Sequence, residues 1–247
     1  MTLAQQAIAP PGRRLYAIGD IHGRYDLLEK LLEMINLDAK NVEGCDQNIL
    51  IFLGDYIDRG ADSKRVIEHL TMPPPAGFEM ICLKGNHEDM LLKFLEGEGP
   101  VLSWLRNGGR ETLKSYGLDV RNLAVSRVTG ADVEKARLDL RAIIPGSHIE
   151  FLACLEQIHI EGDYAFVHAG VRPGVAIAAQ EERDLIWIRD EFLKSDANFG
   201  KIIVHGHSIA SQPSLKANRI GIDTGAWRTD VLTCLVLEGT QRRFIST

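Results

Sequence analysis

Three apolar runs that each end in a cluster of polar residues constrain the fold of this chain most strongly. They read RLYAIGD, NILIFLGD and EMICLKG, at residues 14–20, 48–55 and 79–85. A segment with helical periodicity follows each run. Near-continuous apolar strands that alternate with helices favour a parallel sheet covered on both faces. Ligands of such sheets bind beyond the carboxyl ends of the strands, so Asp20, Asp55 and Asn86 are predicted to share one rim.

The rest of the chain predicts a helical insertion and then further strands. Residues 97–155 contain helical patterns separated by glycine-rich breaks. Five short strand-like segments follow, YAFVHAG, KIIVHGHS, RIGIDTGA, VLTCLVLE and RRFIS, and we expect them to form a second sheet. The turn EGDY, before the first of these, predicts a hairpin. The predicted fold class is α/β, an α+β sandwich of two mixed sheets packed together and flanked by helices. A flexible tail over 1–12 precedes a single domain over 13–247.

Composition and charge exclude several classes of partner. The 247 residues carry a net charge of −6, and nothing global attracts nucleic acid or an anionic membrane. No apolar run approaches the length of a membrane span, and the N-terminus lacks the pattern of a secretory signal. The four cysteines form no C-x-x-C pair, which favours reduced thiols in a cytoplasmic protein. No cysteine is followed by an arginine six residues later, so the nucleophile loop of cysteine phosphatases is absent.

Histidine, aspartate and asparagine side chains at strand ends predict a metal site. They are Asp20, His22, Asp55, Asn86, His168 and His207. Carboxylate and amide oxygens mixed with imidazole suit Mn²⁺, Fe or Zn²⁺. Two such ions about 3.5–4 Å apart can activate water and clamp a phosphate for in-line attack. Asp55 follows the middle one of the first three strands and is the natural bridge between two ions.

Five short motifs resemble those of the calcineurin-like metallophosphoesterases. They are GDIHG, GDYIDRG, GNHE, HAG and GHS, at residues 19–23, 54–60, 85–88, 168–170 and 206–208. Their order resembles most closely the bacterial and phage branch of the PPP-type serine/threonine phosphatases. The resemblance implies a dinuclear-metal enzyme that hydrolyses phosphomonoesters by direct attack of a metal-bridging hydroxide. It implies two divalent ions, with Mn²⁺ expected first and Fe or Zn²⁺ as alternatives.

The same resemblance implies a role for each matching residue. The ligands of the first metal match Asp20, His22 and Asp55, and those of the second match Asp55, Asn86, His168 and His207. His87 matches the general acid. Asp58 matches the carboxylate that orients it. Arg59 matches a phosphate clamp, and Arg189 resembles a second one. Residues implied in substrate binding are Arg59, Lys84, Arg189 and Asn107.

Some positions depart from the family pattern or allow a simpler interpretation. Lys84 stands where the family often has arginine, and lysine lacks the bidentate geometry of a guanidinium group. His205 precedes His207 by two residues, and His207 is the expected ligand because it matches the Gly-His of the family. Arg189 is equally explained as a helix-surface residue, and Asn107 as a helix stop. Trp227 is expected in the core.

Three functions are weighed. The first is hydrolysis of phosphoserine or phosphothreonine in proteins, and the second is hydrolysis of a small phosphorylated molecule such as a symmetrical dinucleoside tetraphosphate. The tetraphosphate hydrolases usually have glutamine where His22 stands, which argues against the second. The third is a non-catalytic phosphate-binding module, disfavoured because the acid, clamp and ligand positions are all filled. The sequence carries no signature of oligomeric state.

Overall fold

Two five-stranded sheets lie face to face in the computed structural model, which describes residues 7–41 and 45–247. The first sheet has the spatial order β10 (Gln241–Ser246), β9 (Thr233–Glu238), β1 (Arg13–Ile18), β2 (Gln47–Phe52) and β3 (Phe78–Cys82). The second has the order β4 (Ile158–Glu161), β5 (Tyr164–Val167), β6 (Ile202–His205), β8 (Arg219–Gly221) and β7 (Ser214–Leu215). Both sheets mix parallel and antiparallel pairs, which confirms the predicted fold class.

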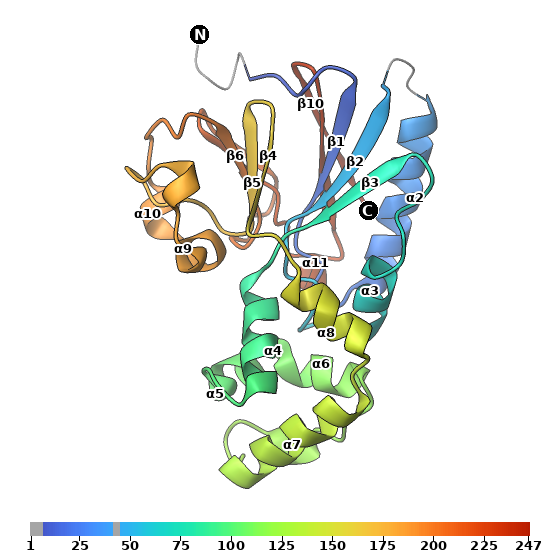
Figure 1. Cartoon of the computed structure of the whole chain (residues 1–247), viewed down its shortest axis with the longest axis vertical. Coiled ribbons are helices and arrows are strands. Elements are labelled where there is room, and N and C mark those ends of the chain that lie inside the picture. Colours follow the sequence, from blue (N-terminus) through green and yellow to red (C-terminus); the bar gives the residue numbers. More distant parts are fainter. Residues whose placement is uncertain (1–6, 42–44) are drawn as a thin grey trace.

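Helices cover the outer faces of the two sheets (Figure 1). Three helices each follow a strand of the first sheet in the chain: α2 (Tyr25–Asn41), α3 (Ser63–Leu70) and α4 (Asn86–Glu96). The insertion contains α5 (Val101–Trp104), η1 (Leu105–Gly109), α6 (Arg110–Ser115), η2 (Arg121–Leu123), α7 (Gly130–Ile143) and α8 (Gly146–Ala153). Beside the second sheet are η3 (Ile177–Ala179), α9 (Glu182–Trp187) and α10 (Asp190–Leu193), and α11 (Ala226–Thr229) precedes β9.

Alternation of side chains along β1 shows how the layers pack. Tyr16 and Ile18 belong to the core under the helices, whereas Leu15 and Ala17 belong to the core between the sheets. Successive side chains of a strand point to opposite faces, so one strand serves both cores. The first sheet therefore has helices on one face and the second sheet on the other. A third core, which includes Phe192, packs α9 and α10 against the second sheet.

The segment 233–246 corrects the sequence-based assignment of strands. VLTCLVLE and RRFIS were expected in the second sheet, but β9 pairs antiparallel with β1 and β10 pairs with β9. Leu235 and Leu237 of β9 lie in the core between the sheets. Pairing with β9 covers the edge of β1 that β2 leaves open, so the buried strand β1 has a partner on each side. The hairpin predicted at EGDY is confirmed, since β4 and β5 pair with Glu161 opposite Tyr164.

Residues 7–12 also differ from expectation. The sequence predicted a flexible tail over 1–12, of which 1–6 lie outside the described residues. Ala7 and Ala9 are buried, and the Ala9 amide donates to the Gly239 carbonyl at 2.8 Å. The Ile8 amide donates to Asp163 at 2.9 Å. These contacts hold 7–12 against both sheets because small alanine side chains fit between the backbone segments. Within the described part of the chain, no helix is long and apolar enough to cross a bilayer.

Candidate metal centre and active site

Loops that follow five strands deliver the predicted site residues to one rim. Asp20 and His22 follow β1, Asp55 and Asp58 follow β2, Asn86 and His87 begin α4 just after β3, His168 follows β5, and His207 follows β6. All eight side chains are buried. Parallel strands end at the same edge of a sheet, which is why residues far apart in the sequence meet here.

Left-handed backbone conformations concentrate at this rim. Six described residues other than glycine have positive φ, and five of them are His22, Asp55, Asp58, Arg59 and His207. Such conformations cost about 1–3 kcal/mol each and persist where the surrounding structure enforces them. The loops are therefore held in strained conformations that point these side chains at one another.

Glu88 ties two of these loops together. Its carboxylate accepts hydrogen bonds from the amides of Asp55 at 2.9 Å, Tyr56 at 2.8 Å and Gly85 at 2.9 Å. A side chain on Gly85 would collide with the Asp55 carboxylate and with the Asp55 backbone. Glycine at 85 and a buried acid at 88 therefore let the end of β2 and the start of α4 approach closely.

One group of possible ligands consists of His22, His87 and Asp55, whose donor atoms lie within 4.8 Å of one another. The Nδ1 of His22 lies 2.8 Å from the Ile57 carbonyl. A carbonyl only accepts, so Nδ1 carries the proton and Nε2 of the neutral ring presents a lone pair. That Nε2 is buried, has no hydrogen-bond partner among the described residues, and lies 3.4 Å from Asp55 Oδ2.

A second group consists of Asp55, His168 and His207. The Nδ1 of His168 donates to the Leu53 carbonyl at 2.8 Å, which leaves Nε2 as a lone pair. This Nε2 faces Asp55 Oδ1 at 3.3 Å and Asn86 Oδ1 at 3.0 Å. Three acceptor atoms thus converge without a hydrogen between them, and a bound cation would remove the repulsion between their lone pairs. The Nε2 of His207 is a further buried nitrogen without a hydrogen-bond partner in the described part of the chain.

The electrostatics of the cluster fit a cation. Burial lowers the pKa of the His22 and His168 rings, and it lowers the pKa of His207 to about 2, so these imidazoles are neutral and able to bind a metal. Burial and the nearby carboxylates of Asp223 and Asp55 raise the pKa of Asp20. Crowded buried carboxylates with raised pKa values are typical of a site that binds positive charge.

Asp55 presents a different oxygen to each group, Oδ2 to His22 and Oδ1 to His168. The backbone amide of His207 lies 3.1 Å from each carboxylate oxygen of Asp20, which brings the β1 and β6 loops together. This donor set fits two divalent ions that share Asp55. His205 lies outside both groups: its Nδ1 lies 3.0 Å from the Gly206 carbonyl and its ring packs on Phe192.

His87 and Asp58 form a buried pair beside the cluster. Nδ1 of His87 lies 2.6 Å from Asp58 Oδ2. Burial by itself lowers the pKa of His87, but the carboxylates of Asp55 and Asp58 outweigh it, and the pKa is raised. The contact of Nδ1 with Asp58 favours the protonated form of the ring, and Nε2 faces the cluster, 3.8 Å from Asp55 Oδ2. This geometry suits a general acid.

Two residues that hold Asp58 were not found from the sequence as parts of the site. Trp104 donates its indole N–H to Asp58 Oδ2 at 2.9 Å, and Thr112 donates to Asp58 Oδ1 at 2.5 Å. Both come from the insertion, for which the sequence analysis identifies no metal or acid–base motif. The insertion is therefore part of the site because it orients the carboxylate behind His87.

The four predicted substrate-binding residues are not equally placed. Nη2 of Arg59 lies 3.3 Å from His87 Nε2. Arg189 donates to the His207 carbonyl at 3.2 Å. The Lys84 ammonium instead contacts Glu182 at 2.8 Å and Asp89 at 3.6 Å. The Asn107 amide donates back to the Ser103 carbonyl at 2.8 Å.

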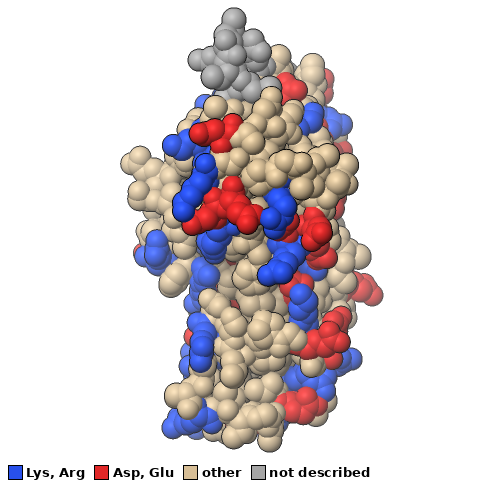
Figure 2. Space-filling model, turned by 90° about the vertical axis from the view of Figure 1, so that its left-hand side faces the viewer, with Lys and Arg blue, Asp and Glu red and all other residues tan. Residues whose placement is uncertain are grey.

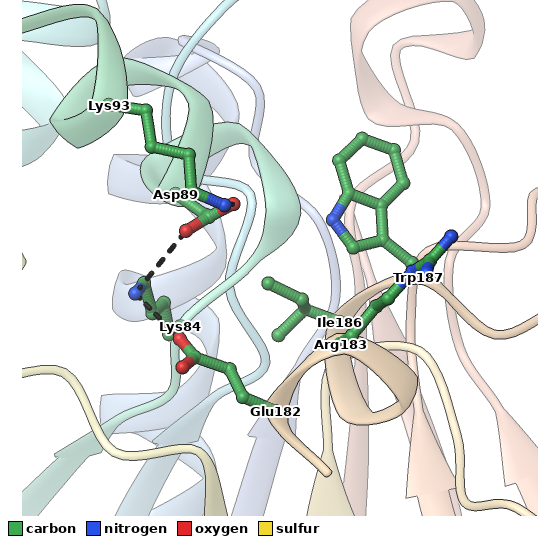
Figure 3. A pocket seen from close by; sticks show the side chains of 7 residues that line it. All are labelled: Lys84, Asp89, Lys93, Glu182, Arg183, Ile186 and Trp187. Carbon is green, nitrogen blue, oxygen red and sulfur yellow. Dashed lines mark hydrogen bonds and ion pairs between the residues drawn. The ribbon is translucent and has the colours of Figure 1, made fainter. Parts of the chain in front are cut away.

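Two pockets adjoin the cluster. The first, here the ion-paired pocket, has a volume of about 480 Å³ and is lined by Lys84, Asp89, Lys93, Glu182, Arg183, Ile186 and Trp187. Figure 3 shows Lys84 between Asp89 of α4 and Glu182 of α9, with Trp187 on the α9 side. The Trp187 ring lies 6.2 Å from the His207 ring.

The second, here the arginine pocket, has a volume of about 600 Å³. Its lining residues are Arg59, Leu105, Arg106, Asn107, Gly108, Arg110, Glu111, Val125, Ile209 and Trp227. Trp227 is 37 % exposed, which corrects the expectation of a core residue, and the Arg59 guanidinium lies 5.2 Å above its ring. Acidic and basic side chains are interspersed over the face that Figure 2 shows.

Comparison with known proteins places these features in a family. Residues 13–224 match the sequence model of the family described as calcineurin-like phosphoesterase. Serine/threonine-protein phosphatase 2 of Escherichia coli (strain K12) is 28% identical over 87% of this chain and 88% of its own length. The protein of that name from Salmonella typhimurium is 30% identical over 87% of this chain and 88% of its own length.

Other similar proteins are named for a different activity. A symmetrical bis(5'-nucleosyl)-tetraphosphatase of Legionella pneumophila (strain Corby) is 42% identical, but over 34% of this chain and 28% of its own. A crystal structure of a putative diadenosine tetraphosphatase superposes with a TM-score of 0.61 at 19% identity, covering 94% of this chain and 93% of that one. At that identity the likeness concerns the fold alone.

Proposed function

The chain belongs to the calcineurin-like phosphoesterase family and is a metal-dependent phosphoester hydrolase, and from this premise we propose that it dephosphorylates phosphoserine and phosphothreonine in proteins. The observation that carries phosphomonoester chemistry is the His87–Asp58 pair, 2.6 Å apart, with Arg59 beside it at the rim of the cluster. Similarity along 87% of the chain to two serine/threonine phosphatases supports the protein substrate.

The proposed ligands are Asp20, His22 and Asp55 for one divalent ion and Asp55, Asn86, His168 and His207 for the other. Bound there, two ions, with Mn²⁺ expected first, would neutralise the phosphate and lower the pKa of water at the site. Asp55 would serve both ions because its two oxygens face different imidazoles.

The side chains around the cluster perform the remaining steps. Arg59 Nη2 lies 3.3 Å from His87 Nε2, so the guanidinium group stands beside the proton-donating nitrogen and can bind a phosphate oxygen there. As water that has lost one proton to solvent attacks phosphorus in line, the bond to the serine or threonine oxygen breaks and His87 gives that oxygen its proton. The ring then takes up a proton from solvent. Asp58 holds the ring by Nδ1 and stabilises its charged form before transfer. Arg189, fixed to the His207 carbonyl, is proposed as the second clamp.

The proposal is tested by hydrolysis measured after chelation and after Mn²⁺ is restored. The substrates are p-nitrophenyl phosphate, a phosphothreonine peptide and diadenosine tetraphosphate, with His87→Asn as the inactive variant. We expect peptide turnover that requires metal and is lost in the variant. Metal-dependent turnover of the dinucleotide alone would overturn the protein substrate and leave the chemistry in place.

A second candidate is hydrolysis of symmetrical dinucleoside tetraphosphates. The 42% identity to the Legionella pneumophila enzyme over a short stretch favours it. His22, at a position where such enzymes usually have glutamine, argues against it. A non-catalytic module is set aside, because the family match and the phosphatase relatives identify an enzyme. All four cysteines are free, which supports a cytoplasmic location as part of the proposal.

A further inference from the structure

The arginine pocket joins the active site to the helical insertion. Arg59 belongs to both, since its guanidinium contacts His87 and also stacks on Trp227. Arg106 and Arg110 reach the pocket from η1 and the start of α6. The insertion is held against the Arg59 loop by a hydrogen bond from the Arg59 amide to the Gly108 carbonyl at 3.3 Å. A group bound in this pocket would therefore lie beside a phosphate at the metal cluster.

The charges of this pocket are not neutralised by the protein. Arg59, Arg106 and Arg110 form no ion pair with a carboxylate within the described part of the chain. Glu111 is the single acid among the lining residues, and no ion pair involves it there. Arg110 donates by Nη2 to the Val120 carbonyl at 3.3 Å, while its buried Nε has no hydrogen-bond partner among the described residues. Three guanidinium groups in one pocket repel each other unless an anion joins them.

The apolar part of the lining indicates what carries that anion. The Trp227 ring, Val125 and Ile209 offer surface to the stem of a side chain, and the volume of about 600 Å³ exceeds that of a phosphate. A guanidinium binds carboxylate or phosphate oxygens in a planar fork. The pocket thus suits an anionic side chain on a short stem next to the scissile group.

We propose that the arginine pocket binds an acidic side chain of a phosphopeptide, close in sequence to the residue that is dephosphorylated. The inference rests on the proposed protein substrate and specifies it further. The anion is a carboxylate of aspartate or glutamate, or the phosphate of a second phosphorylated residue on the same peptide. Arg106 and Arg110 determine this preference, because Arg59 is shared with the centre and acts on every phosphoester.

The test compares three phosphothreonine peptides that differ only in flanking residues: alanine, glutamate or phosphoserine on both sides. Steady-state kcat/KM is measured for the protein reconstituted with Mn²⁺. We expect the two anionic peptides to exceed the alanine peptide by about tenfold at low ionic strength. The preference should weaken as salt is raised, because partly exposed charges are screened. The ratio between the glutamate and phosphoserine peptides identifies the anion.

Arg106→Gln and Arg110→Gln should reduce the ratio of anionic to alanine peptide to about threefold or less. Arg121→Gln is the matched control, since Arg121 lies in the insertion, pairs with Asp119 at 2.6 Å and does not line the pocket. It should keep the full ratio. Thermal unfolding of each variant shows that the folded protein was compared.

Equal kcat/KM for all three peptides, or a ratio that Arg106→Gln and Arg110→Gln leave intact, would overturn this inference while the proposed function stands. Turnover of no peptide, with p-nitrophenyl phosphate still hydrolysed, would overturn the proposed function and this inference with it. The two failures are therefore distinct.

Discussion

The two pockets beside the cluster of proposed metal ligands contain the same number of cationic side chains but differ in how those charges are used. Lys84, Lys93 and Arg183 line the ion-paired pocket, where Asp89 and Glu182 accept ion pairs from the two lysines. Three arginines line the other, and no carboxylate pairs with them in the described residues. Two of the three cations are therefore paired in one pocket, whereas all three are left for a ligand in the other.

This difference shows why a count of basic residues does not locate an anion site. Lys84 stands beside the GNHE motif and was expected to bind substrate, yet two acids already satisfy its ammonium group. Arg106 lies in no motif and is exposed with no ion pair in the described part of the chain. The partners of a cation decide whether it is available, and tertiary packing decides the partners.

The largest expected effect comes from His87, beside the cluster that both pockets adjoin. His87→Asn should lower kcat by about 10²- to 10⁴-fold for every phosphoester, because it removes the proton donor. The loss should be equal for peptides with neutral and acidic flanks. Steady-state kinetics on both peptides checks it, with His69→Asn on α3 as the control. A loss below tenfold would mean that His87 is not the general acid.

Arg59→Lys tests the residue that belongs to both the centre and the arginine pocket. We expect kcat/KM to fall about 10- to 100-fold for all substrates, because lysine cannot make a bidentate contact or stack as a plane on Trp227. Arg65→Lys is a matched control. Arg65 of α3 lies 4.1 Å above the ring of Tyr25 in α2, away from the site. Similar kcat/KM in the two variants would exclude Arg59 as a clamp.

Gly108→Ala tests how much the close contact between the insertion and the Arg59 loop, at the wall of the arginine pocket, contributes to stability. Gly108 has φ of 107°, and a side chain there would collide with Arg59. We expect the free energy of unfolding to fall by about 1–3 kcal/mol. Urea unfolding measures it. Gly117 has φ of 96° with open space around it. A smaller loss of unfolding free energy in Gly117→Ala would therefore isolate the cost of the collision.

The smallest expected effect comes from freeing a charge in the ion-paired pocket. Glu182→Gln removes one partner of Lys84 and should lower KM for the acidic peptide by about two- to fivefold, since a partly exposed ion pair contributes up to about 1 kcal/mol. Glu191→Gln, which removes one of the two acidic partners of Arg172 instead, should leave KM unchanged. An unchanged KM in Glu182→Gln would show that Lys84 does not act on the substrate when only Asp89 is left as its partner.

Much of the fold could be predicted because its signals are local. Apolar runs predicted β1, β2 and β3, and the Gly-Asp and Gly-Asn pairs after them predicted a shared rim, which the structure forms. The assignment of 233–246 to the second sheet was wrong because strand propensity says nothing about which neighbour a strand pairs with. The packing of 7–12 was also missed, since two buried alanines carry little hydrophobic signal.

The sequence alone predicted which side chains gather at the rim, because residues that follow parallel strands meet at one edge of a sheet. Only the tertiary structure decided which charges are available there. Thr112 lies 54 residues from Asp58 and donates to it, and Glu182 lies 98 residues from Lys84 and pairs with it. Neither contact leaves a mark in local sequence, because each depends on where the insertion and α9 pack against the two sheets.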